Sequence, residues 1–543
     1  MDIKDIDGKK IFTHMKNLCD FGYRRAGTEP AFNAERYIYK ELREAGVSDV
    51  QLEEFKFRRW WAEDYILIVL HEGVPSLSED QVIDCFPVWL TGSTKPEGIT
   101  AELVYVGNGT SVDFEKISVE NKIVLVEGKM VLNFYPSYTD RIFDSLALAK
   151  ENGAVGVIFI NGSPLDLRTY IFYMSMLGWR RRLPALSINN IDGEYLKSLC
   201  LQEENNVKMR LVQSVKTEKA PSNMIIGTLP GQTDDIILIG THTDSTFTGA
   251  MDNAAANAGL ITLAKYFADF PQEKRNLTIK FVGWTGHESG LIGVNKFVKM
   301  HQDMLDNIAT FIMLDGLASN GYYNQADGGV VKTGNDEKRG LFITDNSILT
   351  SLVIDAVLKY RLLPAAYVSA KTLPVSDLGP FVFSNVPSIM IIGKSIFYHT
   401  REDKVDRIPP ERLERAIKAH IEIVEKLLNT DPDKIRKADG KLKNFEEFID
   451  ETYGFESPSG FFDILPYPVP VDYSALFYPT VFTCPESIAL DFEWDFGDGD
   501  KSNIILTRHA YNKPGIYNVT FTITDNYGNK ETIKRTIRVI DRQ

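Results

Sequence analysis

The sequence predicts an α/β protein with a doubly wound, mixed but mostly parallel sheet, an inserted β-rich segment and a C-terminal β-sandwich. Apolar segments of strand length alternate with amphipathic helical segments on both sides of residues 75–212, which contain mainly short strands and turns. Residues 466–543 instead alternate single apolar and polar side chains, as half-buried antiparallel strands do. A chain of 543 residues is too long for one hydrophobic core, so we expect several domains.

The first predicted domain is discontinuous and comprises residues 1–74 and 213–430. Near its start, the segment AFNAERYIYKELREAG carries apolar residues at helical spacing and ends at Gly46, a residue suited to a helix C-cap. The interrupting residues 75–212 include the strand-like segments KIVLVEGK and AVGVIFING, which the helical segment RIFDSLALAKENGA separates. We expect this insert to have a core of its own.

The α/β alternation is strongest after the insert. The strand-like segments DIILIGTH, NLTIKFVGW and ATFIMLDG alternate with helical segments, of which ANAGLITLAKYFADF is the clearest. Buried strands connected by helices favour a largely parallel sheet that is covered on both faces. The last helix, ERLERAIKAHIEIVEKLLN, precedes residues 431–465, whose charged and weakly apolar sequence predicts a linker.

The C-terminal segment, residues 466–543, is predicted to form a separate β-sandwich. Apolar residues alternate with polar ones between Tyr517 and Ile523, in GIYNVTFTITDNYG. The glycines and aspartates of WDFGDGD mark a tight turn. We therefore expect Asp495, Asp498 and Asp500 to shape that turn rather than to bind calcium.

Composition and charge exclude several classes of protein. A net charge of −14 argues against a nucleic-acid partner, as does the shortness of the densest basic run, Arg180–Arg182. No stretch reaches the roughly 18 apolar residues of a membrane span, and the four cysteines are too scattered for a thiolate zinc site or a disulfide framework. The start, MDIKDIDGKK, lacks the cationic flank and apolar run of a signal peptide, which by itself favours a cytoplasmic location.

Polar residues follow the predicted strands of the α/β region at the positions where ligands bind. His242 ends DIILIGTH, Glu288 follows KFVGW, and Asp315 ends TFIMLD. Asp252 lies in GAMDNAAANAG at the start of a helix rich in small residues, and His399 follows the apolar run VPSIMIIG. Because open parallel sheets bind ligands beyond the carboxyl ends of their strands, these two imidazoles and three carboxylates form a candidate metal site.

The charges of this candidate site favour two divalent cations. Three ionised carboxylates and one bridging hydroxide would balance two doubly charged ions, which lowers the cost of burying them. Nitrogen and oxygen ligands without thiolates suit zinc, with manganese or cobalt as alternatives. Paired ions of this kind activate a water and polarise a carbonyl group, which is the chemistry of peptide hydrolysis. We expect the carboxylate of Asp244 to hold the outer nitrogen of His242.

Six motifs, in this order, resemble those of the zinc-dependent M28 metallopeptidases: THTDS, GAMDNAAANAG, HESGLIG, LDG, SDLGPF and YHTREDKVD. The resemblance also includes FGYRRAGTEPAFNAERYI near the N-terminus and SNMIIGTLPG before the first candidate ligand. It implies that Asp252 bridges two ions. His242 and Asp315 would complete the protein ligands of the first ion, and Glu288 and His399 would complete those of the second.

The other two segments have resemblances of their own. The insert at 75–212 resembles a protease-associated (PA) domain, and residues 466–543, with WDFGDGD and AYNKPGIYNVTFTITD, resemble a PKD domain. Such modules occur mostly outside cells, so the resemblance implies an extracellular location, in contrast to the literal N-terminus. It also implies that the PKD-like domain binds protein or polysaccharide surfaces.

One position departs from the M28 pattern. The family usually has two adjacent glutamates, of which the second binds metal and the first moves a proton from the bridging water to the leaving amine. Glu288 matches the second, but His287 stands in place of the first. Two nearby cations should lower the pKa of His287 and leave a neutral imidazole able to accept that proton. We therefore expect a metal-dependent exopeptidase, by resemblance an aminopeptidase, with a peptide or protein substrate and an activity reduced by this histidine.

Several alternatives stay open. The chain also fits a binding protein on a peptidase scaffold that has kept its ions, or an enzyme that cyclises N-terminal glutamine. An aminopeptidase is preferred to a carboxypeptidase or dipeptidase only by the family's usual activity. Asp377 and Leu378 depart from the usual Asp-His pair and are expected to mark the substrate side. Asp403 and Asp406 are expected to be solvated or capping residues, with support of His399 as the alternative. The aromatic run at 169–182 is expected to pack in the insert, with a substrate lid as the alternative.

Overall fold

The structure is a computed structural model that describes residues 2–541 except 129–144, 162–166, 169–182, 203–205, 325–329, 338, 364, 372–373, 394, 439–458, 466–467, 483–488, 506 and 526–527. The aromatic run at 169–182 and most of the predicted linker therefore lie outside the described residues. The chain divides into two compact units. The first comprises residues 1–61, 216–322 and 332–443, and the second comprises residues 62–215, 323–331 and 444–543.

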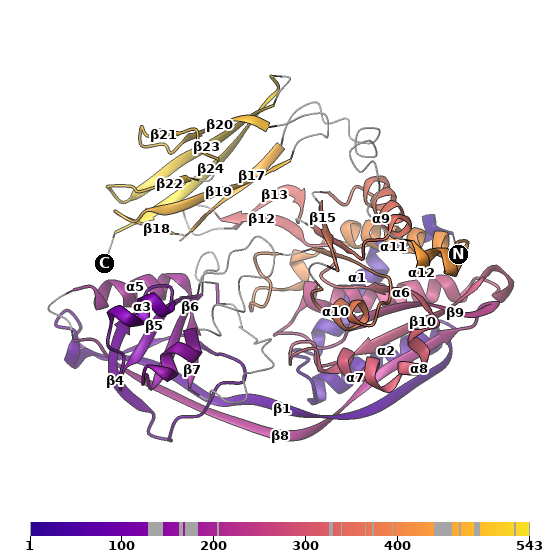
Figure 1. Cartoon of the computed structure of the whole chain (residues 1–543), viewed down its shortest axis with the longest axis horizontal. Helices are drawn as coiled ribbons and strands as arrows, with labels where there is room; N and C mark the ends of the chain where they lie inside the picture. The colour runs from indigo at the N-terminus through magenta and orange to yellow at the C-terminus, as the bar shows by residue number, and fades with distance from the viewer. Residues whose placement is uncertain are drawn as a thin grey trace. The chain divides into compact units, whose positions relative to one another are not determined.

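The first unit is built around a mixed, mostly parallel sheet (Figure 1). Its strands are β8 (Lys208–Leu229), β9 (Thr233–His242), β10 (Leu277–Trp284), β11 (Ile308–Met313), β14 (Arg339–Ile343), β15 (Ala365–Ser369) and β16 (Ser388–Gly393). They lie in the order β15-β14-β16-β11-β9-β10-β8. The neighbours β16, β11, β9 and β10 are mutually parallel, whereas β8 and β14 run antiparallel to their partners β10 and β16. The predicted mixed sheet is confirmed.

Helices cover both faces of this sheet. On one face, where Ile237 and Ile239 of β9 are buried, the helices that pack together are α1 (Gly8–Asp20), α2 (Glu29–Glu44), α6 (Ala255–Ala268), α9 (Ser347–Lys359) and α11 (Pro410–Leu428). On the other face, α7 (Ile292–Met300) contacts α10 (Leu378–Phe383), and Trp284 of β10 meets Phe381. Two short helices, α8 (Gln302–Leu305) and α12 (Pro432–Lys437), complete this unit.

The predicted spacing of apolar residues explains α2. Its residues Ala34, Ile38 and Leu42 recur every four positions and are fully buried, so that they form one stripe against the core. Gly46 follows the helix with a φ of +89°, a left-handed conformation that glycine adopts without a steric penalty. The motif FGYRRAGTEPAFNAERYI, which contains Arg24, therefore continues into a helix that packs against the core of the first unit.

The second unit contains the predicted insert and has an apolar core of its own. Its strands are β2 (Gln81–Ile83), β3 (Phe86–Pro87), β4 (Ile99–Tyr105), β5 (Ile123–Gly128), β6 (Gly156–Asn161) and β7 (Ala185–Ile188). Strands β4 to β7 are parallel to one another, whereas β4 pairs with β8 and β7 with β3 in antiparallel fashion. Helices α3 (Ser111–Lys116) and α5 (Asn190–Cys200) belong to the same segment. Parallel strands therefore give this β-rich segment a partly α/β character. The long strand β1 (Ser48–Leu70), like β8, contributes residues to both units.

The C-terminal region forms two sheets, as predicted for a sandwich. One contains β17 (Ser459–Leu465), β19 (Ala475–Phe482) and β22 (Thr507–His509); the other contains β18 (Val469–Pro470), β20 (Ala489–Asp495), β21 (Lys501–Ser502), β23 (Gly515–Asp525) and β24 (Lys530–Ile540). Trp494 of β20 packs edge-on against Phe462 and Phe477 of the first sheet. Asp495 and Asp498 accept hydrogen bonds from backbone N–H groups two residues later, which is the turn-shaping role expected of them.

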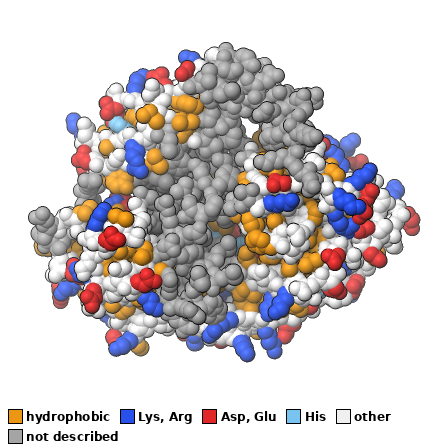
Figure 2. Space-filling view, in the orientation of Figure 1, with side chains coloured by type: hydrophobic (Ala, Val, Ile, Leu, Met, Phe, Trp, Pro, Cys, Tyr) orange, Lys and Arg blue, Asp and Glu red, His pale blue; other side chains and the backbone are white. Residues whose placement is uncertain are grey.

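Acidic and basic side chains are interspersed over the described residues on the face shown in Figure 2. Within the described part of the chain, no helix is both long enough and apolar enough to cross a membrane.

Candidate metal centre

The five predicted ligands are brought together in the first unit, and all five are buried. The parallel strands β11, β9 and β10 end at the same edge of the sheet. This places His242 at the end of β9, Glu288 in the loop after β10 and Asp315 just after β11 in one region. Asp252 lies in a turn, Ala250–Ala254, that leads into α6, and His399 lies in the loop after β16.

Asp252 is at the centre of this group. Its Oδ1 lies 3.1 Å from His242 Nε2, and its Oδ2 lies 3.0 Å from His399 Nε2. Beyond these contacts, His242 Nε2 is 3.6 Å from Asp315 Oδ1, and His399 Nε2 is 3.2 Å from Glu288 Oε2. The two oxygens of one carboxylate thus face two separate imidazole–carboxylate pairs.

The chemistry of these residues fits cations. Among the described residues, the buried atoms His242 Nε2, Asp252 Oδ2 and Glu288 Oε2 have no hydrogen-bond partner of ordinary geometry. Leaving buried polar atoms unsatisfied is costly, and clusters of nitrogen and carboxylate ligands suit zinc and similar divalent ions. Asp252, Glu288 and His399 each offer one ligand atom within 4.8 Å of the other two, as do His242, His287 and Asp315.

The pKa values of the two imidazoles are raised, as expected for histidines among carboxylates. Burial alone would lower the pKa of His242, but Asp244, Asp252 and Asp315 outweigh it and hold the pKa well above its usual value. Burial likewise opposes the charged form of His399, yet Glu288 and Asp252 raise its pKa to about 9. Protons therefore occupy these nitrogens readily, and a cation at the same place would have to displace them.

Two buried residues fix the loop that carries Asp252. The carboxylate of Asp403 accepts hydrogen bonds from the backbone N–H groups of Met251 and Asp252, at 2.9 and 3.1 Å. Asp403 is therefore a capping residue, one of its two predicted roles. Asp406 is 67% exposed and thus solvated.

The second of these residues is Arg24, which the sequence motif FGYRRAG contains. Its fully buried guanidinium donates to the carbonyl oxygens of Leu18, Thr243, Thr248 and Gly249. Three of these carbonyls belong to the loop between His242 and Asp252, so Arg24 sets the course of that loop. The motif was part of the resemblance, but nothing in the sequence indicated this role.

Asp244 contacts His242 and also the next loop. Its carboxylate lies within ion-pair distance of His242 Nδ1, at 3.6 Å, and its backbone carbonyl lies closer, at 3.1 Å. The carboxylate also accepts hydrogen bonds from the backbone N–H groups of His287 and Glu288, at 3.1 and 3.0 Å. It therefore positions the loop that carries both residues.

His287 lies beside the cluster and is paired with Asp377. Its Nδ1 is 3.1 Å from Asp377 Oδ2, the oxygen that also accepts a hydrogen bond from Trp284 Nε1 at 2.8 Å. Burial and His242 lower the pKa of His287, but Asp377 and Glu288 outweigh them and raise it to about 9. The fall in pKa expected from nearby cations therefore has to overcome Asp377, a partner that the sequence did not reveal. Leu378 beside it is fully buried.

The rings of His242 and His287 are stacked, with centroids 4.0 Å apart and an angle of 14° between their planes. An imidazole nitrogen binds metal in the plane of its ring, at about 2.1 Å. One ion could not lie in the planes of both stacked rings. His287, although its ligand atom lies within 4.8 Å of those of His242 and Asp315, would therefore not share an ion with His242.

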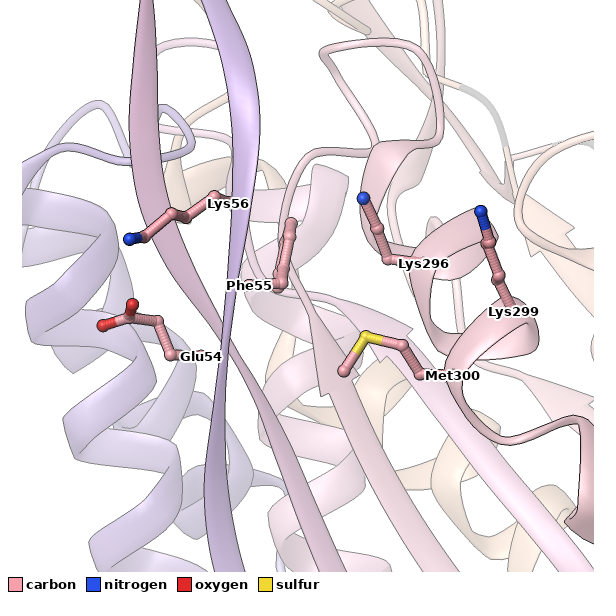
Figure 3. Close-up of a pocket in the computed structure, with 6 residues that line it drawn as sticks. All are labelled: Glu54, Phe55, Lys56, Lys296, Lys299 and Met300. Atoms are coloured by element: carbon pink, nitrogen blue, oxygen red, sulfur yellow. The ribbon is translucent and has the colours of Figure 1, made fainter.

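A separate cavity of about 520 Å³ lies elsewhere in the first unit. Its lining comes from β1 and α7, with the side chains of Lys296 and Lys299 projecting side by side from α7 (Figure 3). No candidate ligand lines it. The six lining residues are Glu54, Phe55, Lys56, Lys296, Lys299 and Met300.

Comparison with known proteins gives the cluster a context. Residues 224–424 match the model of peptidase family M28, and residues 480–540 match that of the PKD domain. Leucine aminopeptidase 2 of Arthroderma otae is 25% identical over 58% of this chain and 60% of its own length. Carboxypeptidase Q of Xenopus laevis is 26% identical over 53% of this chain and 60% of its own. The chain thus spans about three fifths of the length of these relatives.

Solved structures extend the similarity to the fold. BSAP, a zinc aminopeptidase from Bacillus subtilis, is 20% identical and has a TM-score of 0.59 over 78% of this chain and 95% of its own. The aminopeptidase from Aneurinibacillus sp. strain AM-1 is 21% identical and has a TM-score of 0.56 over 78% of this chain and 94% of its own. The chain therefore shares the fold of these aminopeptidases, with residues 224–424 matching the model of peptidase family M28 and residues 480–540, after them, matching that of the PKD domain.

Proposed function

We propose that this chain is a metal-dependent aminopeptidase that uses two divalent ions, with zinc as the preferred metal. The observation that carries the proposal is the position of Asp252, whose two carboxylate oxygens lie 3.1 and 3.0 Å from the imidazoles of His242 and His399. In this assignment Asp252 is shared by both ions. His242 and Asp315 hold the first, and Glu288 and His399 hold the second.

Bound ions of this kind lower the pKa of a water and polarise the carbonyl group of the substrate. A residue of the chain then accepts the proton of this water and later returns it. In our proposal His287 accepts a proton as the water oxygen adds to the carbonyl carbon of the peptide bond. When the C–N bond breaks, the imidazolium returns this proton to the leaving amine, and His287 is neutral again. A general base of this kind typically contributes about 10² to 10⁴ in rate.

The relatives support an exopeptidase but differ in the end of the substrate that they attack. Several are named leucine aminopeptidases, whereas another is named a carboxypeptidase. We assign aminopeptidase activity because most of these names agree on it. The substrate class that follows is a peptide with a free α-amino group.

A second candidate is a protein that keeps the ions but does not hydrolyse peptides. The ion pair between His287 and Asp377 favours this alternative, because a pKa of about 9 opposes the neutral imidazole that proton transfer needs. Nearby cations act in the opposite direction. The balance between these effects decides how active the protein is.

The test uses the full chain loaded with zinc or with manganese. Metal content is measured by elemental analysis, and turnover is measured on matched peptides whose N-terminus or C-terminus is free or blocked, together with a glutaminyl peptide. We expect two ions per chain and hydrolysis that N-terminal acetylation abolishes. Hydrolysis that instead requires a free C-terminus, or cyclisation of the glutaminyl peptide, would contradict the proposal. Two bound ions without any turnover would favour the binding protein.

A further inference from the structure

Two adjacent arginines near the N-terminus have opposite surroundings. Arg24 is fully buried, and its guanidinium donates to backbone carbonyl groups. The side chain of Arg25 is partly exposed and, among the described residues, neither donates a hydrogen bond nor lies within ion-pair distance of a carboxylate. Its guanidinium instead lies over two rings, 5.9 Å from the centroid of Tyr23 and 5.5 Å from that of Trp61. The N–H donors of Arg25 are therefore available to a ligand.

Two guanidinium groups share the ring of Trp61. That of Arg59 lies 4.5 Å from the ring centroid, and that of Arg25 lies 5.5 Å from it. Glu218 pairs with Arg59, whereas no carboxylate of the described residues pairs with Arg25. Because two positive charges against one ring repel each other, an anion is favoured beside the unpaired one. A planar guanidinium suits a carboxylate in particular, which it can bind through two parallel N–H···O bonds.

The same contacts continue to the loops that carry two proposed metal ligands. Tyr23 packs against Phe247, in the loop that leads to Asp252, with 5.7 Å between the ring centroids. The guanidinium of Arg401, which follows His399 closely in the sequence, lies 5.8 Å from the Phe247 centroid. Arginine and aromatic side chains thus alternate from β1 to the metal centre. This arginine–aromatic row comprises, in order, Arg59, Trp61, Arg25, Tyr23, Phe247 and Arg401.

We propose that Arg25 binds a carboxylate of the peptide substrate, so that peptides with such a group are preferred. The carboxylate is either the C-terminal one of a short peptide or the side chain of an acidic residue, since both present the same pair of oxygens. Contact with two rings restricts the guanidinium of Arg25 before it binds, which lowers the entropy lost on binding. This inference rests on the proposed aminopeptidase function and concerns the part of the substrate beyond its free α-amino group.

Matched peptides test the preference in the zinc-loaded chain. Leucyl dipeptides and tripeptides are compared with their C-terminal amides, and amidated peptides with glutamate are compared with those with glutamine. In at least one of the two comparisons, kcat/KM should be about 10 to 100-fold higher for the carboxylate form, mainly through KM. The comparison that shows this preference identifies which carboxylate Arg25 binds.

Substitutions assign the preference to Arg25. Arg25→Ala should abolish it by raising KM for the carboxylate form, with kcat nearly unchanged. Arg25→Lys should recover part of it, because lysine keeps the charge but not the planar fork. Arg36→Ala, which removes an exposed arginine of α2 paired with Glu29, is the matched control and should keep the full preference.

Binding of an uncleavable peptide separates this inference from the proposed function. The same peptides are prepared with the first amide replaced by CH₂–NH, and their affinity for the zinc-loaded chain is measured by calorimetry. The carboxylate form should bind the unsubstituted protein about 10 to 100-fold more tightly than its neutral counterpart, but no more tightly than it in Arg25→Ala. Equal affinities in both comparisons, or a preference that persists in Arg25→Ala, would overturn the inference. Binding with this preference but without hydrolysis of the ordinary peptides would contradict the proposed function alone.

Discussion

The imidazoles of His242 and His287 stack face to face, with 4.0 Å between their centroids, and His242 Nε2 lies 3.1 Å from Asp252 Oδ1. Because an imidazole nitrogen binds metal in the plane of its ring, rings stacked in this way would not bind one ion together. In the proposed function, the stacking places a metal-binding histidine beside one that transfers protons. This arrangement has consequences that can be measured.

Replacing His287 should impair turnover without removing metal. We expect His287→Ala to lower kcat by about 10² to 10⁴-fold, because it deletes the proposed proton acceptor, while both ions stay bound. Steady-state kinetics and elemental analysis on the same preparation check the prediction. Unchanged turnover would remove His287 from the mechanism, and loss of one ion would identify it as a ligand after all.

Replacing proposed ligands should have the opposite result. Because Asp252 faces both imidazoles, we expect Asp252→Ala to lose both ions, whereas His242→Ala should lose the one it shares with Asp315. The measurement is metal per chain after dialysis against zinc-free buffer. Asp406→Ala, an exposed carboxylate close in sequence to His399, is the control and should retain two ions. Equal metal content in all three variants would refute the ligand assignment.

Asp403 should stabilise the loop that carries Asp252. Asp403→Ala leaves the buried N–H groups of Met251 and Asp252 unsatisfied, which we expect to cost about 3 kcal/mol and to weaken metal binding by roughly 10 to 100-fold. Urea unfolding of the metal-free protein and zinc titration measure the two effects separately. The same Asp406→Ala control should change neither. A variant as stable as the parent would show that the loop keeps its shape without this carboxylate.

His420 should make the first unit sensitive to acid. Burial in α11 lowers its pKa from 6.5 to about 4, although Nδ1 bonds to the Ala416 carbonyl. His420 is therefore protonated near pH 6.5 in the unfolded chain but only near pH 4 in the folded protein. The free energy of unfolding is unaffected by this group above pH 6.5. It falls as the pH drops toward 4, by up to roughly 3 kcal/mol.

Substituting His420 checks this prediction. His420→Leu replaces the titratable side chain with an apolar one of similar size. In this variant the free energy of unfolding should fall less steeply between pH 6.5 and 4.5 than in the parent. Urea unfolding at several pH values measures the two slopes. Parallel slopes would mean that another group controls the loss of stability in acid.

Local patterns in the sequence were sufficient for the sheet and for the candidate ligands. Strand-length apolar segments ending in His242 and Asp315 predicted parallel neighbours, and parallel strands place their carboxyl ends at one edge. The partners of Asp244, Arg24 and Asp377 could not be predicted in the same way. Their contacts depend on the course of loops, and loop conformations follow from packing rather than from residue periodicity.

The sequence by itself determined which side chains are candidate ligands, because strand periodicity and the order of polar residues at strand ends are local properties of the chain. Only the tertiary structure decided how the unusual histidine is held. Asp377 reaches His287 from another loop and accepts a hydrogen bond from Trp284, and such distant contacts depend on how the sheet and its helices pack. A carboxylate about 3 Å from an imidazole changes both the orientation and the proton affinity of that imidazole. This distance cannot be inferred from the spacing of residues along the chain.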